Sequence, residues 1–277
     1  MQTIETCLDN GILTVTLNRP EQLNAFNEVM LQELIDVYKS TNDDEAVRVI
    51  IVTGAGKAFC AGMDLAPGDD VFTTKDEMAS FRDLGGQLSL VVYSLQKPII
   101  AALNGAAVGI GITMTLPMDV RIVKTNAKVG FVFGRRGIGP EAASGWFLTK
   151  HVGISKALEW LYTGRMIPTD ELIVSGLMQY AVDDPYVKAV EIAKEIIGNT
   201  SPVSNAFSRQ LLWQMHNIQH PLESHLIESR FLHWVSPTAD VKEGIQSFKE
   251  KRLPNFTLKT NDIPNFFGGN ELTITKQ

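Results

Sequence analysis

Glycines in the middle of the chain are placed to bring backbone donors close to a ligand. The buried apolar run 99–103 ends at Asn104-Gly105, and Gly109 and Gly111 then open a helical segment. Small residues where a strand leads into a helix let a ligand approach N–H groups that the first helical turn leaves unpaired. Such a helix start favours negative charge, which predicts binding of an oxyanion or a phosphate. Glycines that only allow close strand–helix packing give the same pattern, so both interpretations stay open.

Other chemistries lack the residues they need. Met114 stands where the dinucleotide-binding fingerprint requires its third glycine. Ser144 lacks the Gly-x-Ser-x-Gly turn of a serine hydrolase. His216 and His220 are spaced i, i+4, but no glutamate follows His216 as in a zinc-protease helix, and Pro221 interrupts the segment. We therefore expect no metal site.

The segments that must position these residues alternate between strand and helix patterns. Short β-branched runs predict strands, and apolar residues at helical spacing predict the helices between them. We expect strands at 3–8, 12–17, 47–54, 99–103, 119–123 and 128–133, and small-residue loops at 54–65 and 134–141. Helices are expected at 28–40, 77–96, 142–150, 155–163, 169–174 and 185–198. Three more helices, at 203–217, 221–235 and 238–251, follow without a further strand. This order predicts an α/β layered fold. We divide it into a core domain, 1–200, and a C-terminal helical module, 201–277.

Composition and charge narrow the function. The chain has 277 residues, of which 44% are hydrophobic and 20% charged, as in ordinary globular proteins. No apolar run reaches the roughly 18–20 residues that span a bilayer, and the N-terminus does not resemble a signal peptide. Cys7 and Cys60 form no motif, which suits a reducing compartment. We expect a cytoplasmic protein without membrane contact, and the net charge of −6 disfavours nucleic acid as a partner.

Four stretches, in the right order, resemble the motifs of one family. Residues 57–65 (KAFCAGMDL) and 104–111 (NGAAVGIG) resemble the two signature stretches of the crotonase (enoyl-CoA hydratase/isomerase) superfamily. Residues 18–26 look like its N-terminal motif, and 243–254 are similar to its C-terminal ending. The resemblance implies a spiral of repeated ββα units with a C-terminal α-helical module. That module would mediate assembly into a trimer or hexamer and contribute to an acyl-CoA site.

The resemblance also implies a specific chemistry. Members of the family bind acyl-CoA thioesters, and two backbone N–H groups hold the thioester oxygen while an enolate forms. Carried over to this sequence, the two donors are Met63 and Ile110. A backbone donor places no demand on its side chain, which is why Met and Ile can occupy these positions. CoA is then part of the substrate, and no separate cofactor is expected.

The carboxylates of the family hydratases are missing from this sequence. Hydratases of the family place one glutamate three residues after the helix donor and a second further along, and these positions hold Thr113 and Phe133 here. Hydration with two carboxylates is therefore disfavoured, because one group must activate water while the other delivers a proton.

One carboxylate stands at another catalytic position of the family. Glu141 matches the position used by its single-carboxylate isomerases, and Pro140 predicts that Glu141 lies in the first turn of a helix. A partner for the helix dipole would also be acidic there, but the four motifs favour catalysis. Phe131, Phe133 and Trp146 would form an apolar pocket that raises the pKa of Glu141 toward neutrality, or would be plain core.

The substrate-binding positions follow from the same resemblance. Backbone groups would contact the nucleotide end of CoA, residues further along would follow the pantetheine and adenine, and lysines would reach the phosphates. The positions are Gln22, Leu23, Ala25, Lys57, Ala61, Asp64, Gly109, Phe133, Trp146 and Lys249.

The function that these residues favour is enoyl-CoA isomerisation, a 1,3-proton shift from a 3-enoyl to a 2-enoyl thioester with one carboxylate as base. An enoyl-CoA hydratase and a non-catalytic acyl-CoA-binding protein stay open as alternatives. RNA binding, known in one branch of the superfamily, is disfavoured by the acidic charge balance.

Overall fold

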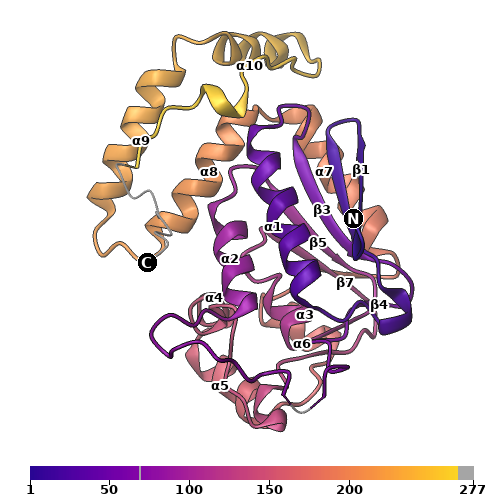
Figure 1. Cartoon of the computed structure of the whole chain (residues 1–277). Helices are drawn as coiled ribbons and strands as arrows, with labels where there is room; N and C mark the ends of the chain where they lie inside the picture. The colour runs from indigo at the N-terminus through magenta and orange to yellow at the C-terminus, as the bar shows by residue number, and fades with distance from the viewer. Residues whose placement is uncertain (69, 268–277) are drawn as a thin grey trace.

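The computed structural model describes residues 1–68 and 70–267 (Figure 1). Within these residues the strands form a six-stranded sheet of order β1-β2-β3-β5-β7-β9 and a three-stranded sheet of order β4-β6-β8. Strand β1 is antiparallel to β2, and all other neighbours are parallel. The strands are β1 (Ile4–Asp9), β2 (Ile12–Leu17), β3 (Val49–Gly54), β4 (Ala58–Cys60), β5 (Ile99–Leu103), β6 (Ala106–Val108), β7 (Val120–Lys124), β8 (Val129–Gly130) and β9 (Tyr180–Val182).

Helices cover both sheets and make up the C-terminal part of the chain. They are α1 (Glu28–Asp43), α2 (Leu84–Ser94), α3 (Ile110–Thr113), α4 (Ser144–Val152), α5 (Ile154–Thr163), α6 (Thr169–Val174), α7 (Pro185–Asn199), α8 (Pro202–Met215), α9 (Pro221–Val235) and α10 (Ala239–Glu250), with short 3₁₀ turns η1 (Pro20–Gln22), η2 (Phe133–Arg136) and η3 (Thr260–Asp262). No helix among the described residues has the length and apolar character that crossing a membrane would demand.

A ββα unit recurs along the core. In β3-β4-α2, β5-β6-α3 and β7-β8-α4, the first strand joins the large sheet, the second joins the small sheet, and a helix follows. The expected spiral of repeated ββα units is confirmed. The sequence did not predict strands β4 and β6, since it indicated a small-residue loop over 54–65 and the opening of a helical segment after Gly105. A strand of three residues is too short to show a period of its own.

The central strands of the large sheet, β3 and β5, are buried on both faces. Alternate residues of a strand point to opposite sides, so Ile50 and Val52 of β3 join the cluster formed with α1 and α2. Val49 and Ile51 join Ala189 and its neighbours on α7 instead. Figure 1 shows α1 and α2 beside one another in front of the sheet. Burial on both faces explains why these strands are continuous apolar runs.

Three other secondary-structure predictions were wrong. The helix expected at 77–96 begins only at Leu84, because the side chain of Asp83 accepts a hydrogen bond from Gly86 N and so caps the helix there. The strand expected at 128–133 is only Val129–Gly130, since η2 follows it. Strand β9 was missed, because its three residues are half-buried or exposed and show no apolar run.

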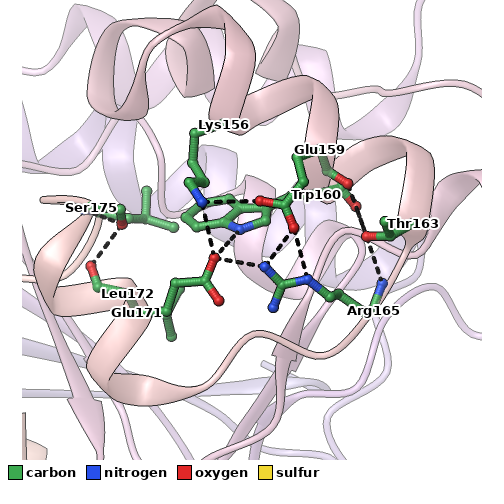
Figure 2. Close-up of polar contacts among 9 residues, drawn as sticks. Lys156, Glu159, Trp160, Thr163, Arg165, Glu171, Leu172 and Ser175 are labelled. Atoms are coloured by element: carbon green, nitrogen blue, oxygen red, sulfur yellow. Dashed lines mark hydrogen bonds and ion pairs between the residues drawn. The ribbon is translucent and has the colours of Figure 1, made fainter.

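An ion-pair network stabilises the segment after β8 (Figure 2). The guanidinium of Arg165 donates to Glu159 at 2.7 Å and to Glu171 at 2.6 Å. The indole N–H of Trp160 also donates to Glu171, at 2.9 Å, and the ring stacks on Phe131 at 5.9 Å between centroids. The network therefore ties α5 and α6 to the chain that leads into η2.

The C-terminal helices have a small apolar core of their own. Phe207 of α8 stacks on Phe231 of α9 with their ring centroids 3.9 Å apart. A buried arginine joins α8 to the main core, since Arg209 pairs with Asp119 at 3.0 Å and donates to Val92 O at 2.9 Å. The division into 1–200 and 201–277 stays a prediction, and residues 268–277 lie outside the described residues.

Candidate active site

The pairing of β4 with β6 brings the two glycine-containing turns together. Ala58 pairs with Ala106 and Cys60 with Ala107, so the chain leaves both strands at the same edge. A Cβ built at Gly111 would lie 2.1 Å from the carbonyl oxygen of Cys60. Only glycine therefore allows α3 to begin against the end of β4, and this close packing places Met63 beside Ile110.

The two expected donors have equivalent surroundings. Gly62 precedes Met63 with φ 122°, and Gly109 precedes Ile110 with φ 57°, conformations that L side chains rarely adopt. Among the described residues neither the Met63 N–H nor the Ile110 N–H donates to a protein acceptor. Two unpaired N–H groups beside one cavity can hold an anionic oxygen.

Both donors line a mainly apolar cavity of about 120 Å³. Glu141 is the one carboxylate among its described lining residues. The cavity also has an arginine, Arg136, at the end of η2. The lining residues are Ala61, Gly62, Met63, Leu65, Phe72, Val108, Gly109, Ile110, Val132, Phe133, Arg136, Ile138 and Glu141.

The sequence predicted that Glu141 lies in the first turn of a helix, but Glu141 lies in the loop before α4. Helix α4 begins at Ser144. Ala142 and Ala143 have φ values of 59° and 52°, and this left-handed conformation prevents a right-handed helix from starting at Pro140. Alanine favours helices, so local propensity predicted the wrong structure here.

Burial dominates the electrostatics of Glu141. Burial raises the pKa of the Glu141 carboxyl, the hydrogen bond from Thr113 lowers it and the nearby charge of Asp83 raises it, and the resulting pKa is about 7. The Thr113 hydroxyl donates to Oε1 at 2.6 Å. Oε2 lies against α2, where a Cβ built at Gly85 would be only 1.8 Å away. A carboxylate that titrates near neutrality can both take up and release a proton.

The aromatic residues expected around Glu141 are only partly there. Phe133 lines the cavity. Trp146 does not, because it packs with Phe147 at 4.7 Å and with Tyr93 at 5.9 Å between ring centroids. Phe131 stacks on Trp160 in the core and is also outside the lining.

The segments expected to bind the nucleotide end of CoA lie side by side. Ala61 N donates to Leu23 O at 3.1 Å. Arg19 pairs with Asp64 at 2.7 Å and donates to Ala25 O at 2.5 Å. Hydrogen bonds from Ala66 N and Arg19 lower the pKa of Asp64, so this carboxylate is a poor proton acceptor.

The remaining binding positions differ in their placement. Gln22 and Lys57 are exposed, at the end of η1 and just before β4. Lys249 is also exposed, on α10, and Figure 1 shows α10 at the opposite end of the molecule from α3 and α4. The structure therefore does not bring Lys249 to the cavity of its own chain.

Several residues of the site were not predicted from the sequence. Phe72, Ile138 and Arg136 line the cavity, and Asp83 and Gly85 contact the loop or side chain of Glu141. The sequence does carry a capping signal for α2 at Asp83, an aspartate followed by a small-residue turn.

Comparison with known proteins identifies the family. The family model described as enoyl-CoA hydratase/isomerase matches residues 8–259. The chain belongs to this family, within the crotonase superfamily. It is 38% identical over 251 residues to enoyl-CoA hydratase ACTT3 of Alternaria alternata, an alignment that covers 89% of this chain and 83% of the relative.

A second relative is named for a different activity. The chain is 31% identical over 266 residues to 1,2-epoxyphenylacetyl-CoA isomerase of Escherichia coli, covering 94% of this chain and all of the relative. Among solved structures, a probable enoyl-CoA hydratase/isomerase from Mycobacterium abscessus superposes with a TM-score of 0.86 at 28% identity, over 92% of this chain and 98% of that one. Hydratase names predominate among the relatives.

Proposed function

We propose that this family member is an enoyl-CoA isomerase that converts a 3-enoyl thioester into the 2-enoyl thioester. Glu141 takes a proton from C2, the C2=C3 bond forms, and the C3=C4 bond breaks as the proton is returned to C4. The thioester oxygen carries the enolate charge in between, held by the N–H groups of Met63 and Ile110. No water is consumed and nothing is oxidised or reduced.

Glu141 is the one carboxylate among the described lining residues of the cavity, and this observation carries the proposal. A 1,3-proton shift needs one group that alternates between base and acid, whereas hydration by the family's two-glutamate route needs two. Thr113 occupies the first hydratase position, and its hydroxyl proton is already donated to Glu141. Phe133 occupies the second and adds only apolar surface. A pKa of about 7 suits a base that must also return its proton.

We also propose how the rest of the substrate binds. The adjoining segments 22–25 and 61–64 would take the nucleotide and pantetheine through backbone groups, with Lys57 near the phosphates. The acyl group would enter the cavity toward Phe133. Glu141 and the two N–H groups supply every proton and charge in this scheme, so we expect no further cofactor and no effect of a chelator on turnover.

Hydration of 2-enoyl-CoA is the second candidate, because hydratase names predominate among the relatives. Incubation with matched panels of 2-enoyl-CoA and 3-enoyl-CoA, with products separated by mass, distinguishes the two reactions. Isomerisation leaves the mass unchanged, whereas hydration adds one water. Glu141→Gln should lose turnover by at least about 10²–10⁴, the usual contribution of a general base.

Glu28→Gln is the matched control, since Glu28 is an exposed glutamate at the start of α1. It should keep full activity. Water-addition products without isomer would overturn the proposal in favour of hydration. Acyl-CoA binding without turnover or α-proton exchange would instead identify a non-catalytic binding protein.

A further inference from the structure

The loop that carries Glu141 is attached to a carboxylate from a distant part of the sequence. Oδ2 of Asp83 accepts hydrogen bonds from Gly86 N at 2.6 Å and from Ala142 N at 2.9 Å. The first bond caps α2, and the second reaches 59 residues along the chain to the residue after Glu141. The same oxygen therefore joins the start of α2 to the Glu141 loop.

The backbone at this attachment is strained. Ala142 and Ala143 both have positive φ, a left-handed conformation that is unfavourable for a residue with a Cβ. Such strain persists only where the surroundings hold it in place. Ala142 is completely buried, and its N–H would lack a partner without Asp83. The Asp83–Ala142 hydrogen bond is thus the contact that compensates for the loop conformation.

The first turn of α2 also forms the wall behind the carboxylate. Besides its contact with Oε2, a Cβ at Gly85 would lie 2.6 Å from Ile110 Cδ1 and 2.9 Å from Ala142 Cβ. The Glu141 loop, the α2 start and the Ile110 donor therefore meet at one point. Any shift of α2 against the loop would change the distance from the base to the enolate position.

We propose that Asp83 is a positioning residue for Glu141, holding its loop against α2 through the Ala142 N–H. The inference rests on the proposed function, in which Glu141 is the base. Asp83 acts through the loop, and it is absent from the described lining of the cavity.

The charge of Asp83 adds a second effect, which gives the proposal a distinctive readout. The charge of Asp83 raises the pKa of Glu141. Substitution of a residue that only capped a helix would leave the pKa of Glu141 unchanged. The other groups that face Glu141 are the Thr113 hydroxyl from α3, the Cys60 thiol from β4 and Arg136 from η2. Burial raises the pKa of Cys60 to about 12, so that thiol stays neutral.

Asp83→Asn separates the charge from the hydrogen bonds. Both bonds go to one oxygen, so the amide oxygen of asparagine can accept them while the charge is lost. The acid limb of kcat/KM against pH should move roughly 0.5–1 pH unit lower, with kcat on the plateau within about threefold. Asp83→Ala removes the bonds as well, and should lower kcat about tenfold or more with KM for the CoA thioester little changed.

Asp184 is the matched control. It caps α7 through Tyr186 N and Val187 N, both at 3.1 Å, and lies outside the cavity. Asp184→Asn and Asp184→Ala should lower the melting temperature without moving the pH profile. If Asp83→Asn leaves the acid limb unmoved and Asp83→Ala keeps native kcat, Asp83 is only a helix cap and the inference is overturned. Should Asp83→Ala fail to fold, the position of the acid limb in Asp83→Asn still tests whether Asp83 acts on Glu141.

Glu141→Gln distinguishes failure of this inference from failure of the proposed function. If Glu141→Gln is inactive while both Asp83 variants keep the native kcat and pH profile, only the role of Asp83 is overturned. A fully active Glu141→Gln would overturn the proposed base and this inference together.

Discussion

The hydroxyl of Thr113 donates a 2.6 Å hydrogen bond to Oε1 of Glu141. Thr113 is completely buried on α3, three residues after the Ile110 donor. The residue at the hydratase glutamate position therefore acts on the remaining carboxylate. Its hydrogen bond favours the charged form of Glu141 and lowers a pKa that burial and Asp83 raise.

Removing this hydroxyl should raise the pKa of the base, Glu141. In Thr113→Val the pKa of Glu141 rises, because the charged form loses its donor, and the acid limb of kcat/KM moves roughly 0.5–1 pH unit higher. At pH 7 the activity falls by about two- to fivefold and recovers near pH 9. Thr115→Val is the control, since Thr115 donates only to Ile112 O of its own turn. An unchanged profile in Thr113→Val would show that the hydrogen bond does not act on the base.

Glu141 should also make stability depend on pH. Its folded pKa, about 7, is raised above the ordinary value of 4.5. The contribution of this group to stability is therefore fully present below pH 4.5 and is lost as pH rises through 7. Glu141→Gln removes that loss and should be more stable than the native chain by roughly 1–3 kcal/mol at pH 8, with no such gain at pH 4.5. Urea unfolding of both proteins at the two pH values measures the difference, and an equal gain at both would contradict the sign.

The sequence predicted those parts of the site that depend on local backbone chemistry. Gly62 and Gly109 precede the two donors, and positive φ at a glycine can be anticipated from the small-residue turns around it. The parallel pairing of β4 with β6 then makes the two turns neighbours. A motif of glycines therefore carries both the local structure and much of its tertiary placement.

The placement of Glu141 could not be predicted in the same way. Its loop conformation depends on Asp83, whose bond to Ala142 N spans 59 residues, and no local pattern encodes such a contact. The overestimated helix at 77–96 has a different cause, because the Asp83 cap that sets the start of α2 is a local contact with Gly86, three residues along the chain. Trp146 was expected at the cavity because it is aromatic and close to Glu141 in sequence, but its helix directs it toward Tyr93.

Gly85 should tolerate no side chain, because Glu141 occupies the space. A Cβ there would lie 1.8 Å from Oε2 of Glu141, so Gly85→Ala must displace the base. We expect kcat to fall about tenfold or more while KM changes little, since the donors and the CoA-binding segments stay in place. Gly198→Ala on α7 is the control, because a Cβ there meets nothing within 4 Å. Steady-state kinetics would contradict the prediction if Gly85→Ala kept native kcat.

The C-terminal helices should take part in assembly. Leu212 of α8, Leu232 of α9 and Phe248 of α10 are 72%, 60% and 85% exposed, and large exposed apolar side chains of this kind are found at protein–protein interfaces. We expect a trimer or hexamer by light scattering at micromolar concentration. Phe248→Ser should shift the protein toward smaller species, whereas Val187→Ser on α7 should not. A monomeric native chain would contradict the prediction.

The Ile110 donor should depend on the backbone of Gly109 rather than on space around it. A Cβ at Gly109 would meet nothing within 4 Å, yet its φ of 57° with ψ −123° is a conformation that alanine avoids. Gly109→Ala should therefore rotate the following peptide and turn the Ile110 N–H away from the enolate oxygen. Loss of one such donor typically costs about 10²–10³ in kcat.

A control at Gly153 separates this effect from strain alone. Gly153 has φ 76° and equally open space, but it lies between α4 and α5, outside the cavity lining. Gly153→Ala should lose stability comparable to that lost by Gly109→Ala while kcat stays within about threefold of native, because the strain is similar but no donor moves. Melting temperatures and kcat are measured for both variants in the same buffer. If the two lose kcat equally, strain explains the loss. If Gly109→Ala keeps native kcat, the Ile110 N–H does not hold the enolate.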